Sequence, residues 1–161
     1  MISLRRMREE EFPAYSDCFI EDYSQEISKN YGYSIERAIE LARQDLQSSF
    51  PNGYELNKHE LLCIEHHVEG QSNMVGYLWH SINTNNNSTF IYDFFVADSM
   101  RGQGIGKQAL EALENQLIEV GIQQIKLRVA YHNERALKLY QEVGFSITGL
   151  NMMKNIEVSC D

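Results

Sequence analysis

A glycine-rich segment, Met-Arg-Gly-Gln-Gly-Ile-Gly at residues 100–106, joins a strongly apolar run to a run with helical spacing of apolar residues. Glycine lets the backbone come close to a ligand and adopt conformations that strain other residues. A helix that begins at such a turn presents unpaired N–H groups and the positive end of its dipole. A strand, a glycine-rich turn and a helix in this order predict an anion site that suits a phosphate or pyrophosphate.

Neither of two common phosphate-binding sequences fits this segment. A P-loop needs Gly-x-x-x-x-Gly-Lys followed by Ser or Thr, but Arg101 stands in place of the first glycine and Gln108 follows the lysine. The dinucleotide fingerprint Gly-x-Gly-x-x-Gly needs a third glycine at position 107, which is lysine, and a place after the first strand of a β-α-β unit. Neither of these nucleotide-binding folds is therefore predicted.

The hydrophobic spacing before the glycine-rich segment predicts a strand, two helices and an antiparallel meander. The expected elements are a strand at 2–7, helices at 9–28 and 33–48, and strands at 61–67, 74–82 and 89–97. Polar clusters between the last three strands are typical of hairpin loops.

The spacing after the segment predicts a helix at 105–120, a strand at 125–129 and a helix from Asn133 to about Val143. A helix between two strands makes a crossover, which implies parallel pairing. Apolar runs at 145–150 and 152–158 predict a closing pair of strands. The whole is an α/β (α+β) fold in one domain over residues 1–161, with a mixed sheet of about six to seven strands and helices on both faces.

The sequence also argues against several classes of protein. It turns charged at once after Met1, without the apolar core of a signal peptide. No apolar run approaches the roughly 20 residues that span a membrane. Cys18, Cys63 and Cys160 lie far apart with no Cys-x-x-Cys, so neither a disulfide framework nor a metal site is predicted. A cytoplasmic protein with reduced thiols and no metal is expected.

Charge is distributed unevenly along the chain. Residues 1–100 hold 7 basic and 16 acidic residues, whereas residues 101–161 hold 7 of each, so the first part carries the whole net charge of −9. Such a field disfavours nucleic acid, whose binding depends on neutralised phosphates. It favours a cationic small molecule or basic peptide as partner, or serves only to keep the protein soluble.

Two segments together resemble the GNAT superfamily of N-acetyltransferases. Residues 101–106, Arg-Gly-Gln-Gly-Ile-Gly, are similar to its acyl-CoA signature R/Q-x-x-G-x-G/A. Residues 133–145 are similar to its second pattern, N-x-x-A-x-x-L-Y-x-x-x-G-F. The two follow in the family's order, separated by a helix and a strand. Within the family the Phe-Ile-Tyr-Asp-Phe strand at 90–94 resembles an uncharacterised bacterial branch.

The resemblance implies a set of contacts with coenzyme A. The backbone of Phe95 and Val96 would pair with the pantetheine amides where their strand splays from its neighbour. Asn133 would bond the coenzyme with its side-chain amide, or serves only as a helix N-cap. Tyr140 would lie near the thioester sulfur and protonate the leaving thiolate, or is only a core aromatic. The backbone amides that would hold the pyrophosphate belong to Arg101, Gly102, Gln103, Gly104, Ile105 and Gly106.

The catalytic base is where the chain departs from the family. Two branches carry a glutamate at positions that are here Phe90 and Arg128. By strand alternation Tyr92 shares the face of Phe90 and Phe94, whereas Asp93 points to the other face. Tyr92 is then a candidate catalytic residue if position 90 faces the cleft, and Asp93 is structural. The candidates that remain, besides a water relay, are Tyr92, Asp93, Asp22 and Glu26.

The predicted function is transfer of an acetyl group from acetyl-CoA to a primary amine, by direct attack in a ternary complex. The alternative is a non-catalytic sensor or regulatory module that binds acyl-CoA. The first two helices and residues 146–153 are expected to wall the acceptor site, for a small-molecule or peptide amine. A homodimer through an exposed strand edge or the C-terminal pair is a further expectation.

Overall fold

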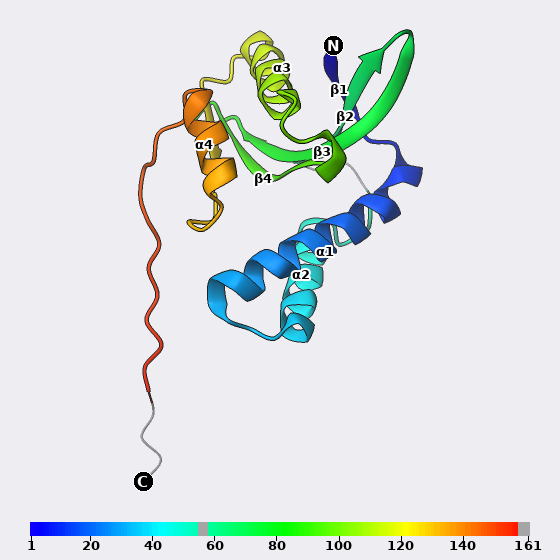
Figure 1. Ribbon diagram of the computed structural model, residues 1–161. Helices are drawn as coiled ribbons and strands as arrows, with labels where there is room; N and C mark the ends of the chain where they lie inside the picture. The colour runs from blue at the N-terminus through cyan, green and yellow to red at the C-terminus, as the bar shows by residue number, and fades with distance from the viewer. Residues whose placement is uncertain (55–57, 158–161) are drawn as a thin grey trace.

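The computed structural model describes residues 1–54 and 58–157. A five-stranded sheet lies between two helical layers (Figure 1). Its strands are in the order β1-β2-β3-β4-β5, with β1 to β4 antiparallel and β5 parallel to β4. The strands are β1 (Ile2–Arg6), β2 (His59–Val68), β3 (Gln71–Asn83), β4 (Ser88–Val96) and β5 (Gln124–Leu127). The predicted meander and parallel crossover are therefore confirmed.

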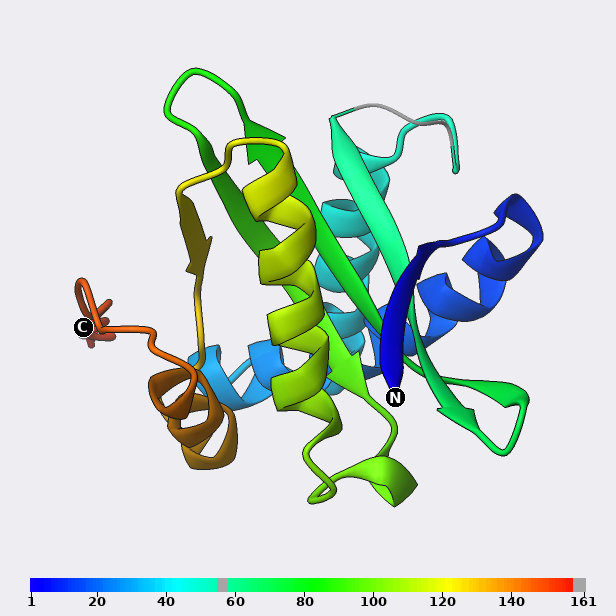
Figure 2. The same cartoon turned by 90° about the horizontal axis from the view of Figure 1, so that it is seen from above.

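Two pairs of helices cover opposite faces of the sheet, as Figure 2 shows from above. One face packs against Tyr15 and Phe19 of α1 and Leu46 of α2. The other packs against Leu113 of α3 and Tyr140 of α4. The helices are α1 (Phe12–Tyr31), α2 (Ile35–Ser49), α3 (Ile105–Glu119) and α4 (Glu134–Glu142), besides the 3-10 turns η1 (Glu9–Glu11) and η2 (Asp98–Met100). No helix in the described ranges is both long and apolar enough to cross a membrane.

The pairing between β4 and β5 ends halfway along β4. Their parallel pairing runs from Ser88 opposite Gln124 to Ile91 opposite Leu127. β4 then continues to Val96, paired only with β3 on its other side. The splay that the family resemblance implies is therefore present, and it leaves one edge of β4 open from residue 92 onward.

A β-bulge in β4 overturns the predicted facing of Tyr92 and Asp93. Asp93 lies opposite Trp79 and Ile91 lies opposite His80, so Tyr92 is an extra residue in the ladder. A bulge shifts the alternation of side chains by one position. Tyr92 stacks on Trp79 and Asp93 bonds to Tyr15, so both face α1 and α2. Phe94 faces α3 and α4 instead.

The C-terminal tail, residues 146–157, corrects a second prediction. The expected strands at 145–150 and 152–157 are absent, and the sheet has five strands in the described residues (position 158 lies outside them). The tail runs away from the sheet and helices in an extended path (Figure 1). Residues 146–153 therefore do not join the first two helices in one wall within this chain.

Candidate active site

The glycine-rich loop has left-handed backbone at two of its glycines and leads directly into α3. Gly102 and Gly104 have φ of +79° and +78°, which is left-handed backbone that favours glycine. Gly104 is the N-cap of α3, so the unpaired amides of the first helical turn follow directly. A Cβ on Gly104 would meet nothing nearer than Gln108 Nε2 at 3.8 Å. The space beside Gly104 is thus open to a ligand.

Gly106 is glycine for a different reason. A Cβ there would lie 3.0 Å from Leu139 of α4 and 3.6 Å from Phe94 of β4. The small residue therefore lets the start of α3 pack closely against β4 and α4. Ile105 buries its side chain in the cluster with Ile64 and Val75, so only its backbone can serve an anion.

The open edge of β4 exposes peptide groups of alternate residues. Ala97 N–H donates to Val75 of β3, and a Cβ on Gly76 of β3 would clash with the carbonyl oxygen of Phe95. The Phe95 peptide groups therefore face β3. Because the peptide groups of successive residues in a strand point to opposite edges, those of Phe94 and Val96 point to the open edge. In agreement, Arg101 Nε reaches the Val96 carbonyl oxygen at 3.0 Å.

Two arginines lie at the glycine-rich loop. Arg101 pairs with Asp98 at 2.7 Å and lies over the Phe95 ring, so Asp98 partly neutralises its charge. Arg135, in the first turn of α4, places Nη2 4.0 Å from where a Cβ on Gly102 would be. The sequence prediction omitted Arg135, although it lies inside the second family-like segment. Its guanidinium brings a positive charge to the predicted anion site.

Asn133 and Tyr140 occupy the start and the body of α4. Asn133 Oδ1 accepts from Ala136 N–H at 3.1 Å, so the N-cap role is confirmed. Its exposed NH₂ group has no hydrogen-bond partner among residues 1–54 and 58–157, and a contact with the coenzyme stays a prediction. Tyr140 is 9% exposed and packs against Phe94 and Phe145. Burial, then the carboxylates of Asp93 and Glu26, raises the pKa of Tyr140 well above its ordinary value.

Asp93 is the carboxyl group that links α1 to the gap between β4 and β5. Its Oδ2 accepts from the hydroxyl of the fully buried Tyr15 at 2.9 Å. Burial raises the pKa of Asp93 to about 7, and Asp22 and Glu26 add to the rise. The Tyr15 hydroxyl and the Phe94 N–H act in the opposite direction. A carboxyl group that titrates near pH 7 can exchange protons under physiological conditions.

Asp22 and Glu26 extend this acidic region along α1. Burial raises the pKa of each, because it disfavours the charged form. Their cationic neighbours, Arg101 beside Asp22 and Arg128 beside Glu26, oppose the rise. Three carboxyl groups, Asp22, Glu26 and Asp93, thus influence one another across the space between α1 and β4. No group of three or more acidic, His or Cys residues in the described ranges is placed to hold a metal ion.

Tyr92 lies in an aromatic group of its own. Its ring centroid is 5.0 Å from Trp79, 5.3 Å from His59 and 4.9 Å from Phe90, and 49% of the residue is exposed. These contacts hold Tyr92 toward the β2 side of β4, whereas Asp93 turns to Tyr15. A catalytic role for Tyr92 stays a prediction.

The raised pKa of Asp93 predicts a pH-dependent stability. Because the folded-state pKa of about 7 exceeds the ordinary 3.8, the wild type loses stability as pH rises from about 4 to about 7. Asp93→Asn removes this cost and is expected to stabilise the fold by about 4 kcal/mol at pH 8, with little gain at pH 4. Urea denaturation at both pH values measures this. Asp17→Asn, at an exposed position on α1, is the control, and an equal gain in both variants would contradict the prediction.

A sheet opened between β4 and β5, beside a left-handed glycine turn at a helix start, is the arrangement expected of the acyltransferase family that the sequence resembles. Residues 4–145 match the Acetyltransferase (GNAT) family. The chain belongs to this family.

Two relatives agree with this assignment over nearly the whole chain, and a third over about half of it. The uncharacterised N-acetyltransferase YycN of Bacillus subtilis is 33% identical over 157 residues, 96% of this chain and 99% of YycN. Its crystal structure matches with a TM-score of 0.88, covering 98% of this chain and 99% of that one. The uncharacterised N-acetyltransferase YdgE of the same organism is 28% identical over 156 residues, 96% of this chain and 98% of YdgE. The Bacillus subtilis spermine/spermidine N(1)-acetyltransferase is 28% identical over 86 residues, 49% of this chain and 57% of that protein.

Proposed function

We propose that this protein transfers the acetyl group of acetyl-CoA to a primary amine, by direct attack in a ternary complex. The observation that carries the proposal is the position of Asp93 and Tyr140 beside the gap between β4 and β5. At one reaction centre, Asp93 would accept a proton and Tyr140 would donate one. A location in the cytoplasm stays a prediction.

The residues around the gap fit a coenzyme A thioester. The carbonyl of Phe94 and the N–H of Val96 are offered to the amides of the pantetheine arm, and they replace the predicted pairing through Phe95. The amides of residues 101–106 and the Arg135 guanidinium offer donors to the pyrophosphate. The Asn133 side-chain NH₂ remains a further donor. Together these groups would place the thioester at the end of the gap that Tyr140 faces.

The chemistry requires two proton transfers. The amine attacks as the neutral free base, and Asp93 in its ionised form takes the one N–H proton that the nitrogen loses as the amide forms. The nitrogen forms a bond to the acetyl carbonyl carbon, and the bond from that carbon to sulfur breaks. Tyr140 gives its hydroxyl proton to the departing sulfur. The raised pKa of Tyr140 keeps this hydroxyl protonated at neutral pH, where an acid must hold its proton.

A cationic amine is the acceptor class that we propose. Asp22, Glu26 and Asp93 form an acidic group between α1 and β4, and the protein carries a net charge of −9. Such a field raises the local concentration of cations. A polyamine is one member of this class, and the similarity to the spermine/spermidine N(1)-acetyltransferase supports its inclusion in an assay panel.

Tyr140→Phe is expected to lower kcat by roughly 10²-fold and to leave the affinity for acetyl-CoA unchanged, because only the transferable proton is lost. Release of free CoA over a panel of polyamines, amino sugars and basic peptides measures kcat, and calorimetry measures binding. Tyr54→Phe is the matched control. Its hydroxyl bonds to the Met7 carbonyl at the other end of α1, away from the gap.

Two outcomes of this experiment would contradict the proposal. Undiminished turnover in Tyr140→Phe would remove Tyr140 as the proton donor. Tight binding of acetyl-CoA by the wild type without turnover of any amine would instead favour the non-catalytic acyl-CoA-binding module.

A further inference from the structure

Tyr92 carries an aromatic ring that its neighbours hold in place on one side only. The ring stacks on Trp79 with a centroid distance of 5.0 Å and an interplanar angle of 26°. His59 and Phe90 meet the ring at steeper interplanar angles of 72° and 57°. Trp79 is buried, whereas 49% of Tyr92 is exposed, so the ring face turned away from Trp79 is left to solvent. A ring fixed in this way can bind a ligand with little further loss of side-chain entropy.

The position of Tyr92 places this ring beside the proposed reaction centre. Pairing between β4 and β5 ends at Ile91, so Tyr92 is the first β4 residue along the gap. The bulge in β4 brings its side chain to the same face of the sheet as that of Asp93, the proposed base. An amine that gives its proton to Asp93 therefore leaves the rest of the acceptor within reach of the Tyr92 ring.

Two basic side chains of β5 and its C-terminal end lie on this face as well. The apolar residues of β5 pack against α3 and α4, so alternation turns Lys126 and Arg128 to the face that carries Tyr92. Lys126 lies opposite Phe90 in the ladder, and Arg128 reaches the Tyr31 hydroxyl at 3.3 Å. In the part of the chain that the structure describes, neither basic group has a carboxylate within 4.0 Å.

The charges on the two sides of Tyr92 therefore have opposite signs. The three carboxyl groups between α1 and β4 favour one ammonium group at the position of the reacting amine. Lys126 and Arg128 would repel a second ammonium group placed over Tyr92. Hydroxyl groups carry no net charge, and they can donate to carboxylates and accept from basic groups. The face of an aromatic ring is partially negative, so it attracts the polarised C–H bonds of a hydroxylated ring.

We propose that Tyr92 determines acceptor specificity by stacking on the ring of an amino sugar, whose amine points to Asp93 and whose hydroxyl groups meet Lys126 and Arg128. This inference rests on the proposed acetyl transfer and narrows its acceptor to a hydroxylated ring with one ammonium group. The aromatic ring of Tyr92 carries the role, and its hydroxyl group is dispensable.

Steady-state acetylation of glucosamine and ethanolamine tests the role of the Tyr92 ring. Tyr92→Ala is expected to raise KM for glucosamine by about 10-fold and to leave kcat within about twofold, because stacking binds the acceptor without taking part in the chemistry. Tyr92→Phe keeps the ring and should retain the wild-type KM and kcat. Ethanolamine has a hydroxyl group but no ring, so its KM should be the same in all three proteins.

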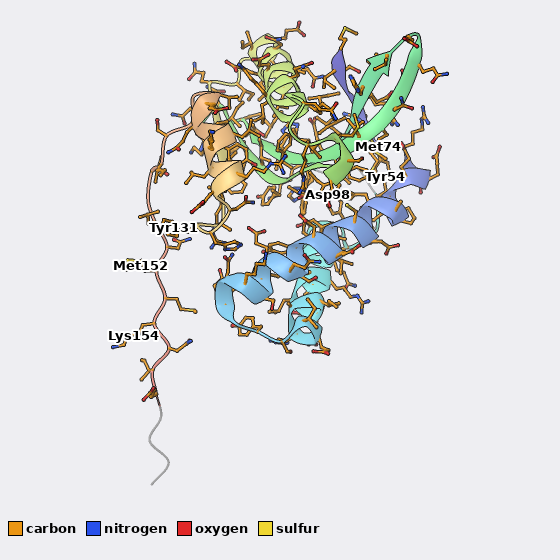
Figure 3. All side chains as sticks on the ribbon, in the orientation of Figure 1. Tyr54, Met74, Asp98, Tyr131, Met152 and Lys154 are labelled. Carbon is orange, nitrogen blue, oxygen red and sulfur yellow. The ribbon has the colours of Figure 1, made fainter. Side chains whose placement is uncertain are left out.

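Charge reversal at Lys126 tests the choice between an amino sugar and a polyamine. The wild type is expected to have a higher kcat/KM for glucosamine than for spermidine. Lys126→Glu should raise kcat/KM for spermidine by about fivefold, because attraction of the second ammonium group replaces repulsion. Lys154→Glu is the matched control and should have no such effect, because Figure 3 shows Lys154 far along the extended tail, away from the sheet.

The outcomes separate this inference from the proposed function. A wild type that prefers spermidine to glucosamine, or a Tyr92→Ala variant with the wild-type KM for glucosamine, would overturn the inference alone. A wild type that acetylates none of the three amines would overturn the proposed function and the inference with it. Tyr92→Leu keeps Trp79 covered without an aromatic ring and gives the same test if Tyr92→Ala does not fold.

Discussion

Asp93→Asn is expected to lower kcat for amine acetylation by about 10²- to 10⁴-fold, which is the contribution of a positioned general base. The amide cannot take a proton from the attacking amine, while its oxygen can still accept the Tyr15 hydroxyl. Affinity for acetyl-CoA should change little, because the Asp93 side chain faces α1 and the coenzyme edge is formed by backbone groups of Phe94 and Val96. Steady-state release of CoA and calorimetric titration measure the two quantities separately.

The pH dependence assigns the effect to Asp93 itself. A base is active when ionised, so kcat/KM of the wild type should rise with pH and level off above the pKa of about 7. Tyr15→Phe removes a hydrogen-bond donor that lowers this pKa, so the rise in kcat/KM should move to higher pH. Asp22→Asn removes a charge that raises this pKa, so the rise should move to lower pH. Shifts of the same sign in both variants, or turnover of Asp93→Asn near that of the wild type, would remove Asp93 as the base.

Gly104→Val is expected to weaken acetyl-CoA binding by at least about 10²-fold, which corresponds to the loss of one or two charge-assisted hydrogen bonds. Valine fills the open space beside the start of α3, and it disfavours the φ of +78° that aims the loop amides. Turnover with any amine should fall with the occupancy of the coenzyme site.

Gly121→Val is the control for Gly104→Val. Gly121 lies just after the other end of α3, has a φ of +79° and would also place its Cβ in open space. The two variants should therefore lose similar stability, which thermal unfolding measures. Only Gly104→Val should lose coenzyme binding. Equal affinity for acetyl-CoA in both variants would show that the loop is not the pyrophosphate site.

The order of elements could be predicted because local signals agree with the fold. The three meander strands and the helices on either side of β5 have clear periodicity and are bounded by glycines or polar turns. The glycine-rich turn also predicted the start of α3 at Ile105. Gly102 and Gly104 have left-handed backbone, so the unusual backbone conformation of this loop could be predicted from its glycines.

The facing of Asp93 could not be predicted from alternation. Nothing in the sequence around Tyr92 marks a bulge, because the extra residue is defined by the register of β4 against β3. Strict alternation therefore predicts that Asp93 lies on the face opposite to Tyr92 and is structural. The bulge instead brings Asp93 to Tyr15, between α1 and the gap.

The tail shows a different limit of sequence interpretation. Its apolar runs predict strands, but a strand forms only where a partner strand is available to pair with it. The structure offers residues 146–157 no partner within the described chain, so the predicted closing pair does not form there. Arg135 was omitted for a related reason, since only the packing of α4 brings its guanidinium beside Gly102.

We propose that acetyl groups pass from acetyl-CoA to a cationic amine at this site. The most direct measurement is mass spectrometry of the amine after incubation with acetyl-CoA and the purified protein, for spermidine, an amino sugar and a lysine peptide. We expect an acetylated amine with the wild type, far less with Asp93→Asn, and a lower yield as salt screens the acidic field. Acetyl-CoA bound by the protein with no acetylated amine in any mixture would contradict the proposed function.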